Sequence, residues 1–167
     1  MKITPNDLNE TTEIAALIRK IDKMDAAYVN AVTDEIFIKQ PFFLTILLGY
    51  RLDVSPIELE EIMKIYFLIW EYFKSHQNVQ TRKVNQFYFE KVQTRNIQML
   101  KYSEGEPSQH DKLSLFAHDL QNLTSKSLLA AVLFSFDNRQ VLVKMDGENR
   151  GAVLIGIKSF IECFETI

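Results

Sequence analysis

The fold of this 167-residue chain is decided by residues 55–73, SPIELEEIMKIYFLIWEYF. Ser55 and Glu58 match a capping box, in which each side chain bonds the backbone N–H of the other at a helix start. Pro56 suits the first helical position, where its missing N–H costs no hydrogen bond. Beyond this start the helix is apolar on nearly every side, so other elements must surround it. We therefore expect an all-α bundle of six to seven helices, with the helix over residues 55–75 at its centre.

One residue breaks the pattern of this helix. Its narrow polar stripe consists of Glu60, Lys64, Glu71 and Lys74, and Phe67 falls within that stripe. A large apolar ring in such a position is covered either by a loop or by a partner protein. Phe67 is therefore a candidate interface residue.

The bulk composition predicts a helical domain. The chain is 47% hydrophobic and 25% charged, as in ordinary globular proteins, and its five glycines and four prolines are too few for a turn-rich β-protein. Its longest apolar runs, residues 42–50 and 65–70, are shorter than the roughly 20 residues that span a bilayer. The start of the chain does not resemble a signal peptide. We expect one domain over residues 1–167, a flexible loop at residues 103–108, and a cytoplasmic location.

Apolar residues at intervals of three and four predict further helices along the chain. They are expected over residues 10–31, 41–50, 81–102, 110–121, from Ser125 or Ser127 to Phe136, and 148–164. Residues 140–144 suit a strand by composition, but no second strand is in sight to pair with them, so a helix or turn is favoured. Residues 41–73 and 127–164 share an order of short and long apolar helices, which fits either a pseudo-symmetric bundle or ordinary helical patterning.

The last of these helices carries a stripe of small residues, Ala152, Gly156, Ser159 and Cys163. Glycine inside a helix costs about 1 kcal/mol relative to alanine, so its presence indicates that another backbone approaches closely. Tight packing within the domain and a homodimer contact both fit this pattern. Ala152, Gly156 and Ser159 are therefore interface candidates, whereas Cys163, among large apolar residues, is expected to be buried.

The strongest catalytic candidate is the pair His118-Asp119. Together with His76 earlier and Asp137 or Asp146 later, the pair resembles the metal-binding set of the HD phosphohydrolases, an all-helical family. The resemblance implies a metal-dependent phosphohydrolase with His76, His118, Asp119 and Asp137 as ligands. Adjacent residues on a helix point about 100° apart, so a boundary position on an ordinary helix also explains His118.

Residues 74–101 carry six basic residues and one glutamate. Three aromatic residues, 87–89, lie among these charges, and nucleic-acid bases stack on aromatic rings while Lys and Arg hold phosphates. This pattern makes Arg82, Lys83, Lys91 and Arg95 candidates for nucleic-acid binding. Neutralisation by the acidic helix that precedes them is the alternative explanation.

No phosphate-binding glycine loop, zinc cluster or nucleophile elbow is present in the sequence. The sequence therefore favours a non-catalytic interaction or adaptor domain that needs no cofactor or metal and binds another protein or a second copy of itself. An HD-like phosphohydrolase is the second hypothesis, and a nucleic-acid-associated protein is the third.

Overall fold

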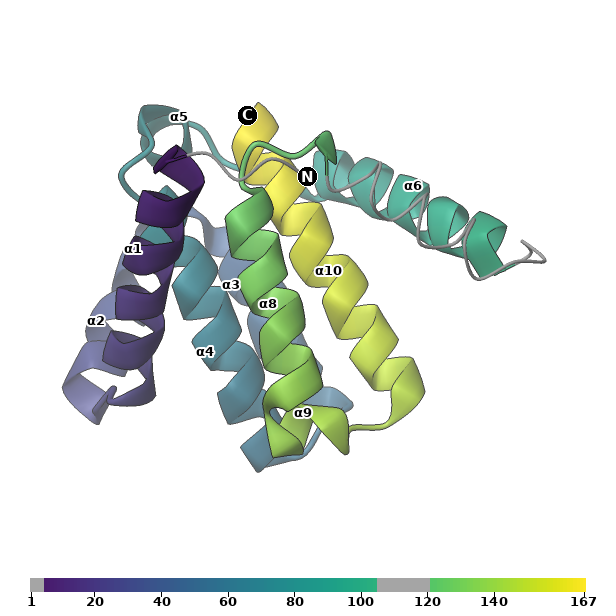
Figure 1. Ribbon diagram of the computed structural model, residues 1–167, viewed down its shortest axis with the longest axis horizontal. Helices are drawn as coiled ribbons and strands as arrows, with labels where there is room; N and C mark the ends of the chain where they lie inside the picture. Colours follow the sequence, from purple (N-terminus) through teal and green to yellow (C-terminus); the bar gives the residue numbers. More distant parts are fainter. Residues whose placement is uncertain (1–4, 105–120) are drawn as a thin grey trace.

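The computed structural model describes residues 5–104 and 121–167, and all regular structure in these two ranges is helical (Figure 1). The elements are α1 (Pro5–Asp22), α2 (Ala26–Lys39), α3 (Pro41–Gly49), the 3-10 helix η1 (Tyr50–Leu52), α4 (Pro56–Phe73), α5 (Gln77–Thr81), α6 (Gln86–Glu104), α8 (Lys126–Asn138), α9 (Gln140–Val143) and α10 (Gly147–Thr166). The all-α class is confirmed, and residues 140–143 are helical. The described ranges hold more helices than the six or seven expected. The first predicted helix is divided into α1 and α2, the short helix α5 is not predicted as a separate element, and α9 forms where a helix or turn is expected.

Helix α4 occupies the centre of the bundle, as predicted. Its capping box is present: Ser55 Oγ accepts from the N–H of Glu58 at 3.3 Å, and Glu58 Oε2 accepts from the N–H of Ser55 at 2.7 Å. Every residue from Ile65 to Trp70 is buried. Helices α1, α3, α8, α9 and α10 all contact α4, which lies between α1 and α8 in Figure 1.

The helix predicted over residues 10–31 is two helices. Asp25 is extended, and its carboxylate accepts a hydrogen bond from the N–H of Tyr28 at 2.8 Å. This N-cap satisfies a free N–H at the start of α2 and so begins a new helix. The apolar spacing runs through this break without interruption, which is why the sequence pattern missed it.

Phe67 is 0% exposed, so the expected partner contact at this residue is wrong. Helix α2 covers the second half of the polar stripe of α4, from Phe67 to Lys74, and the Tyr28 ring meets the Phe67 ring edge-on at 6.3 Å. Two residues of the stripe bind α2: Tyr28 donates to Glu71 at 2.9 Å, and Lys74 pairs with Glu35 at 3.8 Å. The neighbouring Trp70 Nε1 also donates to Glu35, at 2.9 Å.

The small residues of α10 pack inside this chain, so Gly156 and Ser159 are wrong as dimer contacts. Gly156 is buried against the hydroxyl of Tyr50, and Ser159 Oγ accepts from Asn96 Nδ2 of α6 at 3.0 Å. Ala152 is exposed at the edge of this stripe. Cys163 is buried, as predicted.

The basic stretch 74–101 is interrupted by a linker between α5 and α6, which a buried glutamine organises. Gln40 is 0% exposed. Its Nε2 donates to the carbonyls of Val79 and Arg82, each at 2.7 Å, and its Oε1 accepts from the N–H of Val84 at 3.0 Å. The side chain thus replaces the backbone pairing that the linker lacks.

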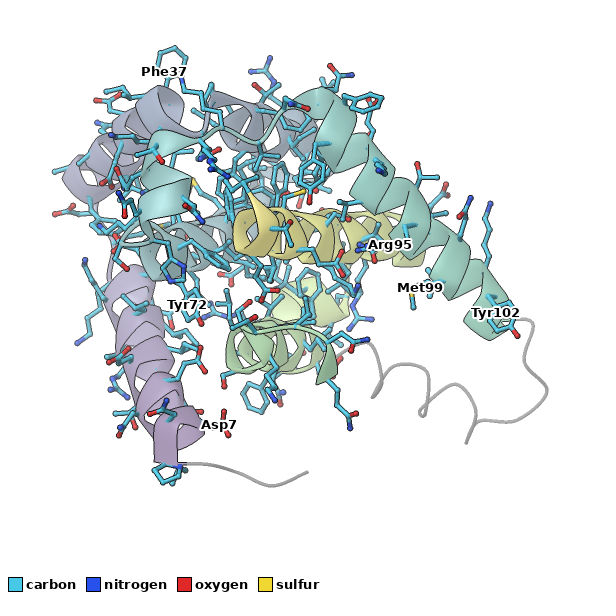
Figure 2. All side chains as sticks on the ribbon, turned by 90° about the horizontal axis from the view of Figure 1, so that it is seen from above. Asp7, Phe37, Tyr72, Arg95, Met99 and Tyr102 are labelled. Carbon is cyan, nitrogen blue, oxygen red and sulfur yellow. The ribbon has the colours of Figure 1, made fainter. Side chains whose placement is uncertain are left out.

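Helix α6 then crosses α10 and reaches away from the bundle, with Tyr102 near its far end (Figure 2). A buried polar network joins the two helices: Glu162 accepts from Arg95 at 2.9 Å, from Asn96 at 2.8 Å and from Lys158 at 2.7 Å. A buried carboxylate is tolerated when it is paired and hydrogen-bonded in this way.

Several predictions fall on residues beyond the described ranges. Residues 103 and 104 belong to α6 rather than to the expected loop, whereas residues 105–108 and 110–120, with His118 and Asp119, lie outside them. Among the residues described, no helix combines the length and the apolar character that crossing a bilayer requires.

Candidate functional site

A cavity lies at one end of the bundle, where four elements meet. It has a volume of about 450 Å³ and is here called the His76 cavity. Its walls come from the end of α4, the start of α5, the approach to α8 and the last turn of α10. The lining residues are Tyr72, Phe73, His76, Gln77, Asn78, Thr124, Ser125, Phe164 and Glu165.

Two further cavities adjoin it. One, of about 500 Å³, lies between α1 and α4 and shares Tyr72 and His76 with the His76 cavity. The other, of about 370 Å³, lies along α6 and shares Glu165 with it. Because the three cavities share wall residues, we treat them as neighbours and together call them the end groove. Figure 2 looks onto this end of the bundle, with Tyr72 and Arg95 labelled.

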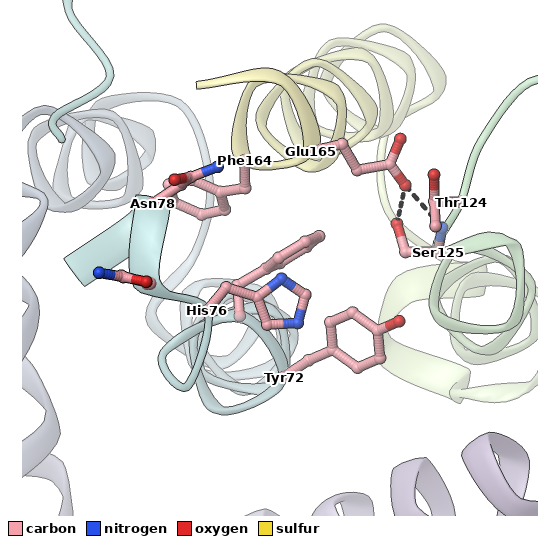
Figure 3. A pocket seen from close by; sticks show the side chains of 9 residues that line it. Tyr72, His76, Asn78, Thr124, Ser125, Phe164 and Glu165 are labelled. Atoms are coloured by element: carbon pink, nitrogen blue, oxygen red, sulfur yellow. Dashed lines mark hydrogen bonds between the residues drawn. The ribbon is translucent and has the colours of Figure 1, made fainter. Parts of the chain in front are cut away.

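The floor of the His76 cavity is apolar, since Phe73 and Phe164 are both buried. The His76 ring lies 5.2 Å from the Phe73 ring and 5.9 Å from the Tyr72 ring. Figure 3 shows His76 and Tyr72 on one side of the cavity and Glu165 with Ser125 across it. His76 is exposed, and its imidazole makes no hydrogen bond with any residue in the described ranges. It is therefore available to a ligand.

Ser125 and Glu165 form a structural clasp. Glu165 Oε1 accepts from the N–H of Ser125 at 2.6 Å and from the Ser125 hydroxyl. Ser125 is the N-cap residue of α8, as one of the two predicted alternatives had it, but its hydroxyl bonds Glu165 rather than the backbone of α8. The clasp fixes the start of α8 to the end of α10.

Carboxylates outnumber the one arginine, Arg95, among the charged residues that line the end groove. They are Glu10, Glu13, Glu71, Glu162 and Glu165. Lysine or arginine side chains pair with Glu71 and Glu162. In the two described ranges, no lysine or arginine pairs with Glu10, Glu13 or Glu165.

Burial and these carboxylates together raise the pKa of the Tyr72 phenol. Its hydroxyl donates to Glu10. Burial, this hydrogen bond and the nearby charges of Glu165 and Glu13 all raise the pKa of Tyr72, because each of them disfavours the phenolate. The groove therefore disfavours anions and favours a positively charged ligand.

Of the expected metal set, His118 and Asp119 lie outside the described residues, and the other two members, His76 and Asp137, are far apart. His76 lies beside Ser125, which precedes α8, whereas Asp137 is near the other end of that helix and pairs with Arg150 at 3.0 Å. About 12 residues of helix separate them, or roughly 18 Å, so they cannot share one ion. The described residues contain no group of three His, Cys, Asp or Glu able to hold a metal.

The nucleic-acid candidates lie apart from the walls of the His76 cavity. Arg82, Lys83 and Lys91 are exposed, whereas Arg95 lines the end groove and pairs with Glu162. The three aromatic residues do not share one surface: Phe89 enters the core and stacks on Phe160 at 4.2 Å, whereas Phe87 points out and is 80% exposed.

Sequence reasoning missed most of the groove residues. It singles out His76, but as a metal ligand, and it singles out neither Tyr72 nor Glu165. Glu165 belongs to the polar side of its own helix, and only the packing of α10 against α8 gives it a partner. No spacing rule within one segment reveals such a site.

Comparisons of the chain with protein-family models, with curated proteins and with solved structures find no match. Function must therefore be inferred from the end groove itself.

Proposed function

We propose that this chain is a non-catalytic interaction domain that binds a segment of another protein in the end groove. One observation carries the proposal: three adjoining cavities share walls at one end of the bundle, around an exposed histidine that has no hydrogen-bond partner in the described ranges. Ligand sites are typically concave and largely apolar, with a few polar groups that fix orientation.

The shape of the groove favours a peptide segment over a small molecule. Each cavity alone, at about 370 to 500 Å³, is large enough for a small ligand. The three lie in series from α1 to α6. An extended chain can fill such a series, one side chain to a cavity.

The polar groups of the His76 cavity favour binding over catalysis. A serine nucleophile requires a base that takes its proton and a third group that orients the base. The Ser125 hydroxyl instead donates to Glu165, which also holds the Ser125 N–H, and Ser125 is 2% exposed. This arrangement suits a fixed wall rather than a reacting group.

Site-specific photo-crosslinking in the full-length protein tests the proposal. A benzophenone amino acid is placed at Asn78, an exposed lining residue, and at Asn138, an exposed control position at the other end of α8. We expect a discrete adduct from Asn78 and none from Asn138, and mass spectrometry of the adduct identifies the partner. Equal labelling from both positions, or none from Asn78, would refute the proposal.

A blocking variant then tests the groove with the purified partner. Thr124→Trp fills the rim of the His76 cavity, and Thr94→Trp adds the same ring to an exposed site on α6. Calorimetry should show binding lost in the first variant and retained in the second. If the adduct consists of two copies of this chain, light scattering should show a dimer that Thr124→Trp dissociates.

A second function, nucleic-acid binding, is favoured by the exposed ring of Phe87. This ring is 80% exposed; Lys91, one turn further along α6, and Lys83, in the linker before α6, are exposed too. Anisotropy of a labelled single-stranded oligonucleotide tests it: binding should weaken steeply between about 50 and 200 mM salt as counterions are displaced. At any one salt concentration, Phe87→Ala should bind the oligonucleotide more weakly than the wild type, because a stacking ring is lost. No binding by the wild type at about 50 mM salt would exclude this function.

A further inference from the structure

We infer that the segment bound in the end groove carries an arginine, whose guanidinium lies between the His76–Tyr72 rings and the Glu165 carboxylate. The inference rests on the proposed function and specifies the chemistry of its partner. The floor, the rim and the uncompensated charges of the His76 cavity each support it.

The floor and wall of the cavity suit a long side chain with an apolar stem. Phe73 and Phe164 form an apolar base, over which methylene groups can lie. Arginine buries such a stem while its charged head reaches a polar rim. The rings of Tyr72 and His76 stand beside this path (Figure 3). Aromatic faces attract cations, and guanidinium stacks on them.

The rim offers carboxylates with unused capacity. Glu165 uses Oε1 for both of its bonds to Ser125, and its Oε2 makes no hydrogen bond with any residue in the described ranges. Across the Tyr72–His76 wall, Glu13 lines the next cavity and has no cationic partner among the described residues. A guanidinium in the His76 cavity would pair with Glu165, and Glu13, across the wall, would add a weaker attraction over a longer distance.

The alternatives to arginine fit the cavity less well. A carboxylate or phosphate would meet the charges of Glu165 and Glu13, and like charges repel. An uncharged apolar side chain would cover the floor but leave those carboxylates without a partner. Lysine offers the charge without a flat surface to stack on Tyr72 and His76.

The test uses N-acetylarginine amide as the probe and N-acetylcitrulline amide as its uncharged isostere. The backbone amide signals of the ¹⁵N-labelled full-length chain are followed by NMR as each compound is added. With the arginine compound we expect saturable shifts at Asn78, Thr124 and Ser125, weakened by salt because the attraction is between charges. Equal shifts from both compounds would refute the inference.

Charge-neutral variants add a matched control. Glu165→Gln keeps the oxygen that accepts from Ser125 and removes the charge, so affinity for the arginine probe should fall about tenfold. Glu13→Gln, at an exposed position, should reduce it about threefold. Glu90→Gln removes one exposed charge from α6, outside the cavity, and should leave affinity unchanged. A loss of affinity as large in Glu90→Gln as in Glu165→Gln would contradict the inference.

The outcomes separate the inference from the proposed function. If a crosslinked partner binds in the groove but keeps its affinity when its arginines are changed to glutamine, the inference fails and the interaction function stands. If the arginine probe binds in the cavity and no partner protein crosslinks there, the chemistry is supported and the interaction function fails. If neither occurs, both are wrong.

Discussion

The hydroxyl of Tyr50 lies against the bare α-carbon of Gly156, so close that a methyl group on that carbon would come within 2.5 Å of it. The same hydroxyl is 2.9 Å from the hydroxyl of Tyr66, which is completely buried in α4. Burial raises the pKa of Tyr50 to about 12, so both phenols are neutral at ordinary pH and share one hydrogen bond. The glycine therefore makes room for a pair of tyrosines, one buried and one partly buried, that joins η1, α4 and α10.

We predict that Gly156→Ala destabilises the protein, although alanine is the better helix former. The methyl group must displace the Tyr50 hydroxyl, which would leave the Tyr66 hydroxyl buried without a partner at a cost of about 1 to 3 kcal/mol. Alanine regains about 1 kcal/mol of helix propensity, which offsets only part of a cost in the middle of that range. Urea unfolding followed by circular dichroism should show a free energy of unfolding lowered by about 1 kcal/mol, and by no more than about 2 kcal/mol.

Two further variants identify the cause. In a Tyr50→Phe background the clash is absent, so Gly156→Ala should become neutral or stabilising. Gly151→Ala lies in the same helix, and its methyl group would meet no atom within 4 Å, so this variant should stabilise. If Gly156→Ala costs the same with and without the Tyr50 hydroxyl, the contact is not the reason for the glycine.

A second prediction concerns Gln40. Gln40→Met keeps the length of the side chain and removes its three hydrogen bonds, so the carbonyls of Val79 and Arg82 and the N–H of Val84 lose their partner. Each buried group left unpaired costs about 1 to 3 kcal/mol, and we expect a total loss of at least about 2 kcal/mol. Hydrogen exchange should accelerate most at the Val84 amide. Gln86→Met, at an exposed position, is the control and should change stability by less than about 0.5 kcal/mol.

These two residues show where sequence reasoning about the fold stops. The capping box at Ser55 and the apolar surface of α4 are local signals, and they predict the class and the central helix correctly. Gln40 sits before a proline in an ordinary polar position, and nothing within its own segment indicates that it is buried. Its role depends on a linker about 40 residues further along the chain, and only tertiary packing brings the two together.

At the candidate site, too, the sequence reveals local features but not the contacts that tertiary packing creates. His76 attracts attention because histidine is chemically versatile, but its neighbours in space come from α4, the approach to α8 and α10. The partner contact expected at Phe67 is wrong because α2 covers this residue. The sequence pattern predicts one helix over residues 10–31, and so does not reveal α2 as a separate helix that can fold back onto α4. Asp25 begins α2 as a separate helix, and so determines which residues cover α4.

A third prediction concerns acid stability and Glu71. Burial raises the pKa of this carboxyl, but hydrogen bonds from Lys74 and Tyr28 outweigh burial and hold the pKa below its ordinary value of 4.5. A lowered pKa in the folded state means that the unfolded chain takes up the proton first as pH falls. The stabilisation is therefore complete well above pH 4.5 and is lost as pH falls through the folded-state pKa.

Glu71→Gln should lower the free energy of unfolding by about 1 to 3 kcal/mol at neutral pH. The difference from the wild type should shrink as the pH is lowered from about 5 to about 3, because the wild type loses the charged interaction that the variant lacks. Urea titrations at several pH values measure both effects. Glu60→Gln, at an exposed position on α4, should differ little from the wild type at any of these pH values. A pH-independent difference between Glu71→Gln and the wild type would contradict the assignment.

The last prediction concerns the single thiol. Cys163 is buried. Burial, and to a smaller extent the negative charge of Glu162, raise the pKa of its thiol to about 12, and the positive charge of Arg95 offsets only a small part of this rise. Only the thiolate reacts, so at about pH 8 the folded protein should resist a thiol reagent such as Ellman's reagent, whereas the unfolded chain should react at once. The labelling rate in native buffer should therefore report transient opening of α10. It should rise in Gly156→Ala and Gln40→Met, which weaken the packing around α10 and α6, and fall below the wild-type value in Gly151→Ala, which stabilises α10. Fast, stoichiometric labelling of the wild type in native buffer would show that the thiol is accessible and would overturn its assignment to the core.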